Sequence, residues 1–511
     1  MFLADAVAGY IETLNERDFD APFIALLYSQ GFTNVHLTHG PLEFGKDFIA
    51  RRTEQGIETQ YVFQSKAGKI SLSEWREVRG QIDSMRYGNV VHPDFDPDLS
   101  RRLVLVTTGR LTGTALVEFQ EYNQHCEARG HEAAELWDID VLLPQLTEVL
   151  IAGVPVHQRA RTVELWGRLG SGEGTWAEIR AYSRDWFKPG LSTRERWEQT
   201  LTGAMLTKAA QKAGREDLAA CLALLLIRRE WENPPEGGTQ ANGSPLRAAR
   251  RLFLATALEF WETARAEESN YEAIDLIVTH PVRTARANEI LSLLGIYLLN
   301  YSEESENPDK VVAEIAQHID SAFKKDEAAA HLVSDDYAIS LLATCTFLAA
   351  CGHDAAIPPI LRAAAVWIFD RADEGHGIAP VGSSASEVVN RLLGTPYEHV
   401  KSAGNGRSSY AITVIADLSL LLGHQELYAD VCNDIWALDL IPQLVLPTEV
   451  EQADLIARVE YSRDGSTAPE HHSASAKHLP SYSDGALFDC IAGWTTLRDR
   501  HHPVVIAAVT S

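Results

Sequence analysis

Cysteine is scarce in this chain of 511 residues, with six thiols scattered along its length. No two cysteines have the C-x-x-C spacing, and no histidine accompanies one at the spacing of zinc ligands. The sequence therefore predicts neither a disulfide framework nor a cysteine-based zinc site. Such sparing use of cysteine is typical of a cytoplasmic protein, and the cytoplasm is the simplest compartment to expect.

Long apolar runs are lacking as well. The longest, from Ile339 to Cys351, is interrupted by serine and threonine and is shorter than the roughly 18 residues that a membrane span needs. The first residues have no basic segment, and Asp5 and Glu12 break their apolar pattern, which argues against a signal peptide. We expect no membrane partner for this protein.

Positive charge is in short supply, because 45 lysines and arginines face 71 aspartates and glutamates and leave a net charge of -26. Such a balance works against indiscriminate binding to nucleic acid, since affinity for a phosphate backbone grows with the number of cations that neutralise it. The deficit is uneven: residues 40–110 hold 11 basic and 10 acidic side chains, whereas residues 151–511 hold 32 and 48. The segment at 40–110 is therefore much the less acidic of the two.

The order of apolar patterns predicts an α/β domain in residues 1–150. The expected elements are helices within residues 1–30, strands at 33–38, 48–49 and 60–66, a helix at 71–85, a strand at 102–107, a helix at 111–129, a strand at 134–137 and a helix at 141–150. The near-continuous apolar run at 102–107 is typical of a buried parallel strand. We expect a mixed central sheet flanked by helices.

The chain is too long for one ordinary core, so we expect further domains after residue 150. Helical spacing dominates there and predicts a helical connector at 151–232. A linker rich in proline and glycine is expected at 233–247. Residues 248–511 read as a large all-α domain, whose helix pairs are typical of a solenoid-like array although no fixed period is found.

The candidate site begins with Asp47, next to a predicted strand. Gln64 and Lys66 alternate on the following strand and therefore share one face of it, while its aromatic residues face the other way. A carboxylate, a polar side chain and a lysine in this arrangement are suited to holding a divalent metal against a phosphodiester. Spacing alone favours the plainer interpretation, in which Asp47 ends a surface strand and the other two form a solvated edge.

A family resemblance adds weight to the site. The segments that carry it are Gly31-Phe32, Val35-His36-Leu37-Thr38, Gly45-Lys46-Asp47-Phe48-Ile49, Val62-Phe63-Gln64-Ser65-Lys66 and Leu105-Val106-Thr107-Thr108-Gly109. In this order they resemble the Mrr-like branch of the PD-(D/E)XK restriction-endonuclease superfamily, over about the first 145 residues. That branch commonly has a glutamine two residues before the lysine, as Gln64 is here.

The family also often has a glutamate on the helix that precedes the Gly-aromatic step. The matching position, 11 residues before Gly31, holds Asp20, whose side chain is one methylene shorter. Glu12 and Asp18 are the other candidates for this role. The resemblance implies an endonuclease fold in which one of these carboxylates faces the metal.

The resemblance implies hydrolysis of DNA phosphodiester bonds with Mg²⁺ or Mn²⁺ as cofactor. Asp47, Gln64, the carbonyl of Ser65 and Asp20 would be the metal-facing groups. A carboxylate-bound ion of this kind acts as a Lewis acid on the phosphate. Lys66 would orient or deprotonate the attacking water and stabilise the charge that develops on phosphorus oxygens.

Four basic residues near the site are expected to grip flanking phosphates, a role that positions nucleic acid without reading its sequence. They are Arg51, Arg52, Lys69 and Arg76. Cutting both strands of a duplex at once requires two active sites, so a homo-oligomer, a dimer or larger, is expected from mechanism.

The helical region would sense a trigger ligand or a partner protein, a layout that resembles bacterial anti-phage defence or restriction effectors. Two alternatives stay open at this point. One is a catalytically inactive nuclease fold that serves as a scaffold or binding protein, and the other is a nuclease that cleaves RNA.

Overall fold

The computed structural model describes residues 2–38, 47–89, 92–149, 159–188, 190–232, 244–266, 280–301, 306–380, 385–394 and 407–442, together with Ser383 and Phe488. The chain divides into two compact units. Unit 1 contains residues 1–171, 188–209 and 240–248, and unit 2 contains residues 172–187, 210–239 and 249–511. Most of the predicted linker at 233–247 lies outside the described residues, and a helix begins at Pro245.

The elements of unit 1 follow the order that the sequence predicts. They are α1 (Phe2–Glu12), α2 (Glu16–Ser29), β1 (Thr33–Leu37), β2 (Phe48–Glu54), β3 (Ile57–Lys66), α3 (Leu72–Tyr87), β4 (Arg101–Thr107), α4 (Thr114–Ala128), β5 (Glu135–Trp137), α5 (Ile139–Val149) and α6 (Arg159–Gly170). The second strand is longer than predicted, because it continues past Ile49 to Glu54 and forms a hairpin with β3.

In the described part of unit 1 the strands form one five-stranded mixed sheet in the order β1-β2-β3-β4-β5. The first three strands are antiparallel neighbours, and β3, β4 and β5 run parallel to one another. Parallel neighbours need a crossover connection, which α3 and α4 provide. The prediction of a buried parallel strand at 102–107 is therefore confirmed.

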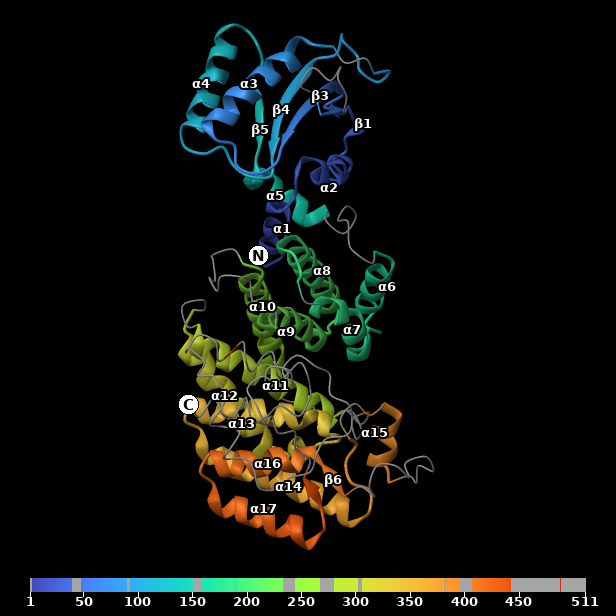
Figure 1. Cartoon of the computed structure of the whole chain (residues 1–511), viewed down its shortest axis with the longest axis vertical. Helices are drawn as coiled ribbons and strands as arrows, with labels where there is room; N and C mark the ends of the chain where they lie inside the picture. The colour runs from blue at the N-terminus through green and yellow to red at the C-terminus, as the bar shows by residue number, and fades with distance from the viewer. Residues whose placement is uncertain are drawn as a thin grey trace. The chain divides into compact units, whose positions relative to one another are not determined.

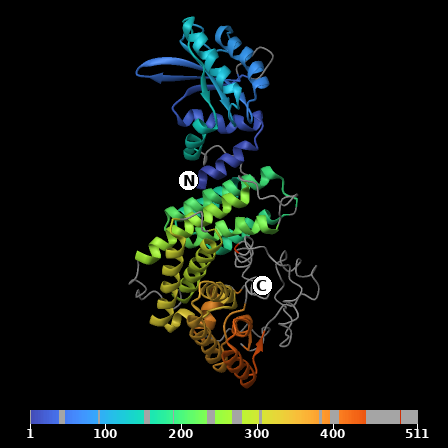
Figure 2. The same ribbon diagram turned by 90° about the vertical axis from the view of Figure 1, so that its left-hand side faces the viewer.

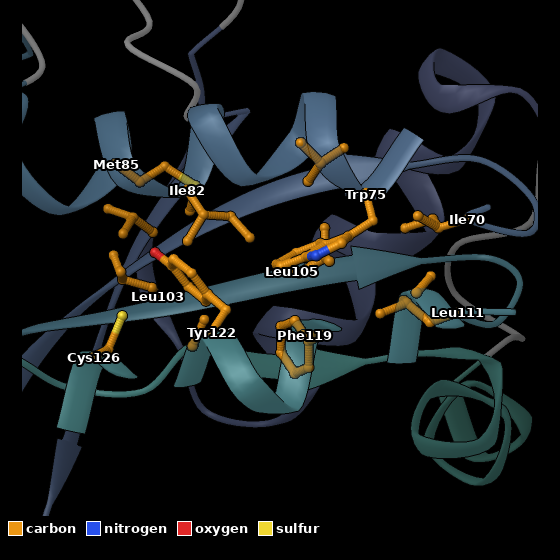
Figure 3. Packing of buried hydrophobic residues seen from close by; sticks show 14 of the residues in the cluster. Ile70, Trp75, Ile82, Met85, Leu103, Leu105, Leu111, Phe119, Tyr122 and Cys126 are labelled. Carbon is orange, nitrogen blue, oxygen red and sulfur yellow. The ribbon is translucent and has the colours of Figure 1, made fainter. Parts of the chain in front are cut away.

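Helices cover both faces of the sheet. Figure 1 shows α3 and α4 side by side over one face, and Figure 3 shows the apolar side chains between them and β4. Trp75 is fully buried there, with its ring centroid 5.2 Å from that of Phe119 and 5.7 Å from that of Tyr122. On the other face α2 packs its Phe23 against Phe63 of β3, with ring centroids 5.3 Å apart. Unit 1 is thus an α/β domain with a central mixed sheet.

Unit 2 is helical in its described part apart from two strands of two residues each. Its elements are α7 (Trp176–Ser183), η1 (Arg184–Phe187), α9 (Glu216–Glu232), α11 (His280–Asn300), α12 (Pro308–Lys325), η5 (Glu327–Ala330), η6 (Asp335–Tyr337), α13 (Ala338–Ala350), η7 (Asp354–Ala356), α14 (Ile357–Asp373), α15 (Ala385–Leu392), β6 (Ser408–Ser409), α16 (Tyr410–Leu421), α17 (Gln425–Ala437) and β7 (Ile441–Pro442). Two more helices, α8 (Thr193–Lys212) and α10 (Pro245–Ala266), have residues in both units. From α11 onward the larger helices are stacked on one another (Figures 1 and 2). Among the described helices none has the length and apolar character of a membrane span.

A buried carboxylate joins η6 to α16 in unit 2. Asp335 is fully buried, and its Oδ1 accepts hydrogen bonds from the hydroxyl of Ser409 and from the backbone N–H of Ala411, both at 2.8 Å. These donors are the N-cap residue and a first-turn residue of α16, so the aspartate helps to cap that helix from a distance. Burial raises the pKa of Asp335 to about 6, although the hydrogen bonds oppose this effect.

This raised pKa predicts a pH dependence of stability. The folded state holds the Asp335 proton more tightly than the unfolded chain, so this stabilisation is complete below about pH 4 and is lost as the pH rises through about 6. The full effect is roughly 3 kcal/mol in the free energy of unfolding. Denaturant unfolding of the wild type and of Asp335→Asn between pH 4 and pH 7 measures it as a difference. Parallel pH profiles for the two proteins would contradict the assignment.

Candidate functional site

The register of the β2–β3 hairpin brings Asp47 next to Gln64. Phe48 pairs with Phe63. Asp47, which precedes Phe48, therefore lies beside Gln64, which follows Phe63. Backbone hydrogen bonds hold Asp47 on both sides: its N–H donates to the carbonyl of Phe63 at 2.8 Å, and its carbonyl accepts from the N–H of Thr38 at 2.9 Å. Asp47 is therefore fixed between the end of β1 and the end of β3.

The carboxylate of Asp47 is held against β3 by two donors. Its Oδ2 accepts the backbone N–H of Ser65 at 2.7 Å and the side-chain Nε2 of Gln64 at 2.6 Å. Gln64 is 3% exposed, and its Oε1 is buried without a hydrogen-bond partner among the described residues. An unpaired buried acceptor is costly and calls for a partner.

This donor set fits a divalent metal. Carboxylate and amide oxygens are ligands that Mg²⁺ accepts, and the unpaired Oε1 of Gln64 lies in the side chain that touches Asp47. The carbonyl of Ser65 belongs to the same corner, because the Gln64 amide approaches it at 3.4 Å. Three of the four metal-facing groups expected from the sequence are thus neighbours.

Lys66 ends β3, and its ammonium group forms an ion pair with α2. Nζ lies 3.0 Å from Oε1 of Glu16, with the side chains 25% and 49% exposed. Sequence reasoning did not name Glu16, since it lies 50 residues from its partner and no motif marks it. A partly exposed pair of this kind contributes little stability, so its main effect is to orient the lysine.

The other acidic candidates lie on the helices before β1. Asp20 follows Glu16 by four residues on α2, so both side chains share one face of that helix. Asp18 instead pairs with Arg194, with Oδ2 and Nη1 2.5 Å apart. Glu12 is an exposed residue at the end of α1. Among these acidic residues of α2, it is Glu16 whose side chain contacts Lys66. The metal-facing role of Asp20 stays a prediction.

Substitution of Glu16 by glutamine tests its influence on the lysine. We expect the free energy of unfolding to change by about 1 kcal/mol or less, because the ion pair is exposed. In a DNA-cleavage assay, Glu16→Gln should nevertheless lower kcat about tenfold with little change in KM. Glu121→Gln, an exposed position on α4, is the matched control. Equal kcat for both variants would remove Glu16 from the site.

The segment that follows Lys66 packs closely on the end of β4. The Thr107 hydroxyl donates to the carbonyl of Gly68 at 2.6 Å, and the N–H of Gly68 donates to the Thr108 hydroxyl at 2.7 Å. Gly109 lies so near that a Cβ added to it would be 2.4 Å from the carbonyl carbon and oxygen of Gly68. Glycine is therefore required at this position, and the Thr-Thr-Gly step supports the end of β3.

Gly109→Ala is expected to destabilise unit 1 by about 1–3 kcal/mol, because backbone atoms must shift to admit the methyl group. Thermal denaturation of the full chain measures this. Gly80→Ala is the matched control: nothing lies within 4 Å of a Cβ there, and alanine in the interior of α3 should stabilise by about 0.5–1 kcal/mol. Equal melting temperatures for the two variants would contradict the close packing.

The basic residues expected to grip phosphate are spread over the domain. Arg51 donates to the carbonyl of Asp94 and lies 3.5 Å from Glu58, while Arg52 lies 3.3 Å from Glu54. Adjacent residues on β2 point to opposite faces, so these two arginines do not act on one face together.

Lys69 and Arg76 follow the candidate site along the chain. Lys69 is exposed and forms no ion pair with another described residue. Arg76 of α3 pairs with Glu118 of α4, with Nη2 and Oε1 2.7 Å apart. Of the four basic residues expected to grip phosphate, Lys69 can therefore bind one without first breaking an ion pair with a described acidic residue.

Comparisons with known proteins return no match for this chain, whether among family models, curated proteins or solved structures.

Proposed function

We propose that unit 1 is a metal-dependent nuclease domain that hydrolyses DNA phosphodiester bonds, with the Mrr-like resemblance as the family expectation. The observation that carries the proposal is the contact between Asp47 and Gln64, with Lys66 two residues further along β3. There a carboxylate touches an amide whose Oε1 is buried and unpaired, and a lysine ends the same strand. A solvated strand edge, the plainer interpretation, does not explain why Gln64 is 3% exposed.

In this proposal Asp47, Gln64 and the Ser65 carbonyl would hold Mg²⁺ or Mn²⁺, with Asp20 as the further carboxylate. The ion, when bound, would supply Lewis-acid chemistry at the phosphate. Lys66 would direct its ammonium group toward the attacking water and the charge that builds on the phosphate oxygens. Glu16 would keep the lysine oriented, because the two side chains form an ion pair at 3.0 Å.

The direct test is incubation of the full chain with supercoiled plasmid and Mg²⁺, with EDTA as the negative control. We expect nicked and linear products that depend on Mg²⁺, and little cleavage of single-stranded RNA of similar length. Preferential cleavage of the RNA would move the substrate class to RNA. A chain that cleaves neither substrate, with or without a trigger ligand present, would contradict the proposal.

We further propose that unit 2 regulates or assembles the nuclease, by binding a trigger ligand or partner protein and by forming a homo-oligomer. The support is the contrast between a sheet domain with a candidate site and a helical unit whose larger helices are stacked as in solenoid-like arrays (Figure 2). A role in bacterial defence against phage is the analogy that this layout favours.

An inactive scaffold is the second candidate function, and two observations favour it. The polar groups of the site partly satisfy one another, because Gln64 Nε2 donates to Asp47 and Lys66 pairs with Glu16. A net charge of -26 also disfavours a nucleic-acid partner. Mg²⁺ binding separates the two functions, since a scaffold has no need of the metal.

A further inference from the structure

The edge strand β1 and the loop between α3 and β4 bring two histidines and an aspartate together. Nε2 of His36 lies 2.7 Å from Oδ2 of Asp94, and Nδ1 of His92 lies 3.9 Å from the same oxygen. The two imidazole rings have centroids 4.3 Å apart and are tilted by 40°. One candidate ligand atom from each of the three residues lies within 4.8 Å of the others.

One ordinary hydrogen bond lies within this cluster, because the backbone N–H of Asp94 donates to Nδ1 of His92 at 3.2 Å, but no hydrogen bond accounts for His36. Nε2 of His36 is a buried atom, and its approach to Asp94 does not meet hydrogen-bond geometry, so it has no hydrogen-bond partner among the described residues. A buried imidazole nitrogen without such a partner is unfavourable. Neutral imidazole nitrogens are also common metal ligands, and a bound ion would satisfy this atom.

The loop that carries His92 and Asp94 is firmly anchored to the sheet. Arg51 donates from Nη2 and Nε to the carbonyl of Asp94 at 2.6 and 3.2 Å. The Gln60 side chain makes two hydrogen bonds with the backbone of Asp96, at 3.0 and 3.2 Å. Such outer contacts orient the groups that ligate a metal and are themselves part of a working metal site.

We propose that His36, His92 and Asp94 form a binding site for a divalent transition metal such as Zn²⁺. Imidazole nitrogen favours metals of this kind, whereas Mg²⁺ favours oxygen ligands. Ligand bonds of about 2.1 Å place ligand atoms about 3 to 4 Å apart, so the side chains need only small rotations to close around an ion. Water would complete the coordination of three protein ligands.

The cluster is distinct from the Asp47 corner but lies on the same face of the sheet. His36 pairs with Ile49, which follows Asp47 by two residues on β2. Paired residues and residues two apart share a face of a sheet. A metal at the cluster would brace β1 against the anchored loop, beside the strand that begins next to Asp47.

Titration of the metal-free full chain with Co²⁺, followed by visible absorption, tests the proposal. We expect the wild type to show the absorption of nitrogen-ligated Co²⁺ and to lose it when Zn²⁺ is added. His36→Gln and His92→Gln should each weaken Co²⁺ binding on the order of 100-fold. His125→Gln, at an exposed position on α4, is the control that should keep the wild-type absorption.

Thermal denaturation supplies the second readout. Zn²⁺ should raise the Tm of the wild type and leave the Tm of both histidine variants unchanged, and melts without metal show which variants are folded. Two results would overturn the proposal. If the wild type binds no Co²⁺, the cluster is an ion pair only. If a folded His36→Gln or His92→Gln variant keeps the Co²⁺ absorption, the metal binds elsewhere.

Discussion

Replacement of Lys66 by alanine is expected to slow Mg²⁺-dependent DNA cleavage by about 10²- to 10³-fold. Lys66 is the last residue of β3 and lies two residues beyond Gln64, so the alternation of side chains places both on the same face of the strand. Its loss would leave the charge that develops on the phosphate without a nearby cation. The measurement is the single-turnover rate of plasmid nicking at saturating enzyme, which reports the chemical step and not product release.

Two comparisons make this result specific. Lys208→Ala removes an exposed lysine of α8 in unit 1 and should leave the nicking rate unchanged. The melting temperature of Lys66→Ala should be close to that of the wild type, because the ion pair with Glu16 is exposed and weak. A nicking rate within about threefold of the wild type would exclude Lys66 from the mechanism.

Trp75→Ala is expected to destabilise unit 1 by about 3–5 kcal/mol, the range for a large aromatic side chain removed from a core. Trp75 has no exposed surface and contacts Phe119 and Tyr122 edge-to-face (Figure 3). Val62 belongs to the same cluster and lies two residues before Gln64 on β3. Loss of this packing should therefore also loosen the strand end that carries the site.

The indole nitrogen of Trp75 refines this prediction. Nε1 is buried without a hydrogen-bond partner among the described residues, so phenylalanine removes an unsatisfied donor while it keeps most of the apolar volume. We expect Trp75→Phe to cost less than about 2 kcal/mol. Trp166→Ala, at a position 37% exposed on α6, is the control for loss of an indole at the surface. Denaturant unfolding gives all three values, and similar losses for Trp75→Ala and Trp166→Ala would contradict the packing.

The elements around the site can be predicted from sequence because their signals are local. The apolar run Tyr61-Val62-Phe63 marks β3, and a capping box marks the start of α3, where the backbone N–H of Ser71 donates to Glu74 at 2.7 Å. Asp47 and Gln64 meet because they belong to consecutive antiparallel strands joined by a short turn. Short connections of this kind let a linear pattern fix a contact.

Contacts between distant elements carry no such signal. Glu16 meets Lys66 only because α2 packs across the sheet, and the sequence motif pointed to the next turn of that helix, at Asp20. The cluster of His36, His92 and Asp94 joins an edge strand to a loop 56 residues later, and no ligand spacing announces it. Both depend on tertiary packing, which periodicity does not encode.

Calorimetric titration of the full chain with Mg²⁺ tests most directly whether Asp47 and Gln64 hold a divalent metal. The wild type should bind Mg²⁺ at one site, and Asp47→Asn should lose the binding heat while it keeps the wild-type melting temperature. His36→Gln should bind Mg²⁺ as the wild type does, since its cluster favours transition metals. Unchanged binding by Asp47→Asn, or no binding by the wild type, would contradict the assignment.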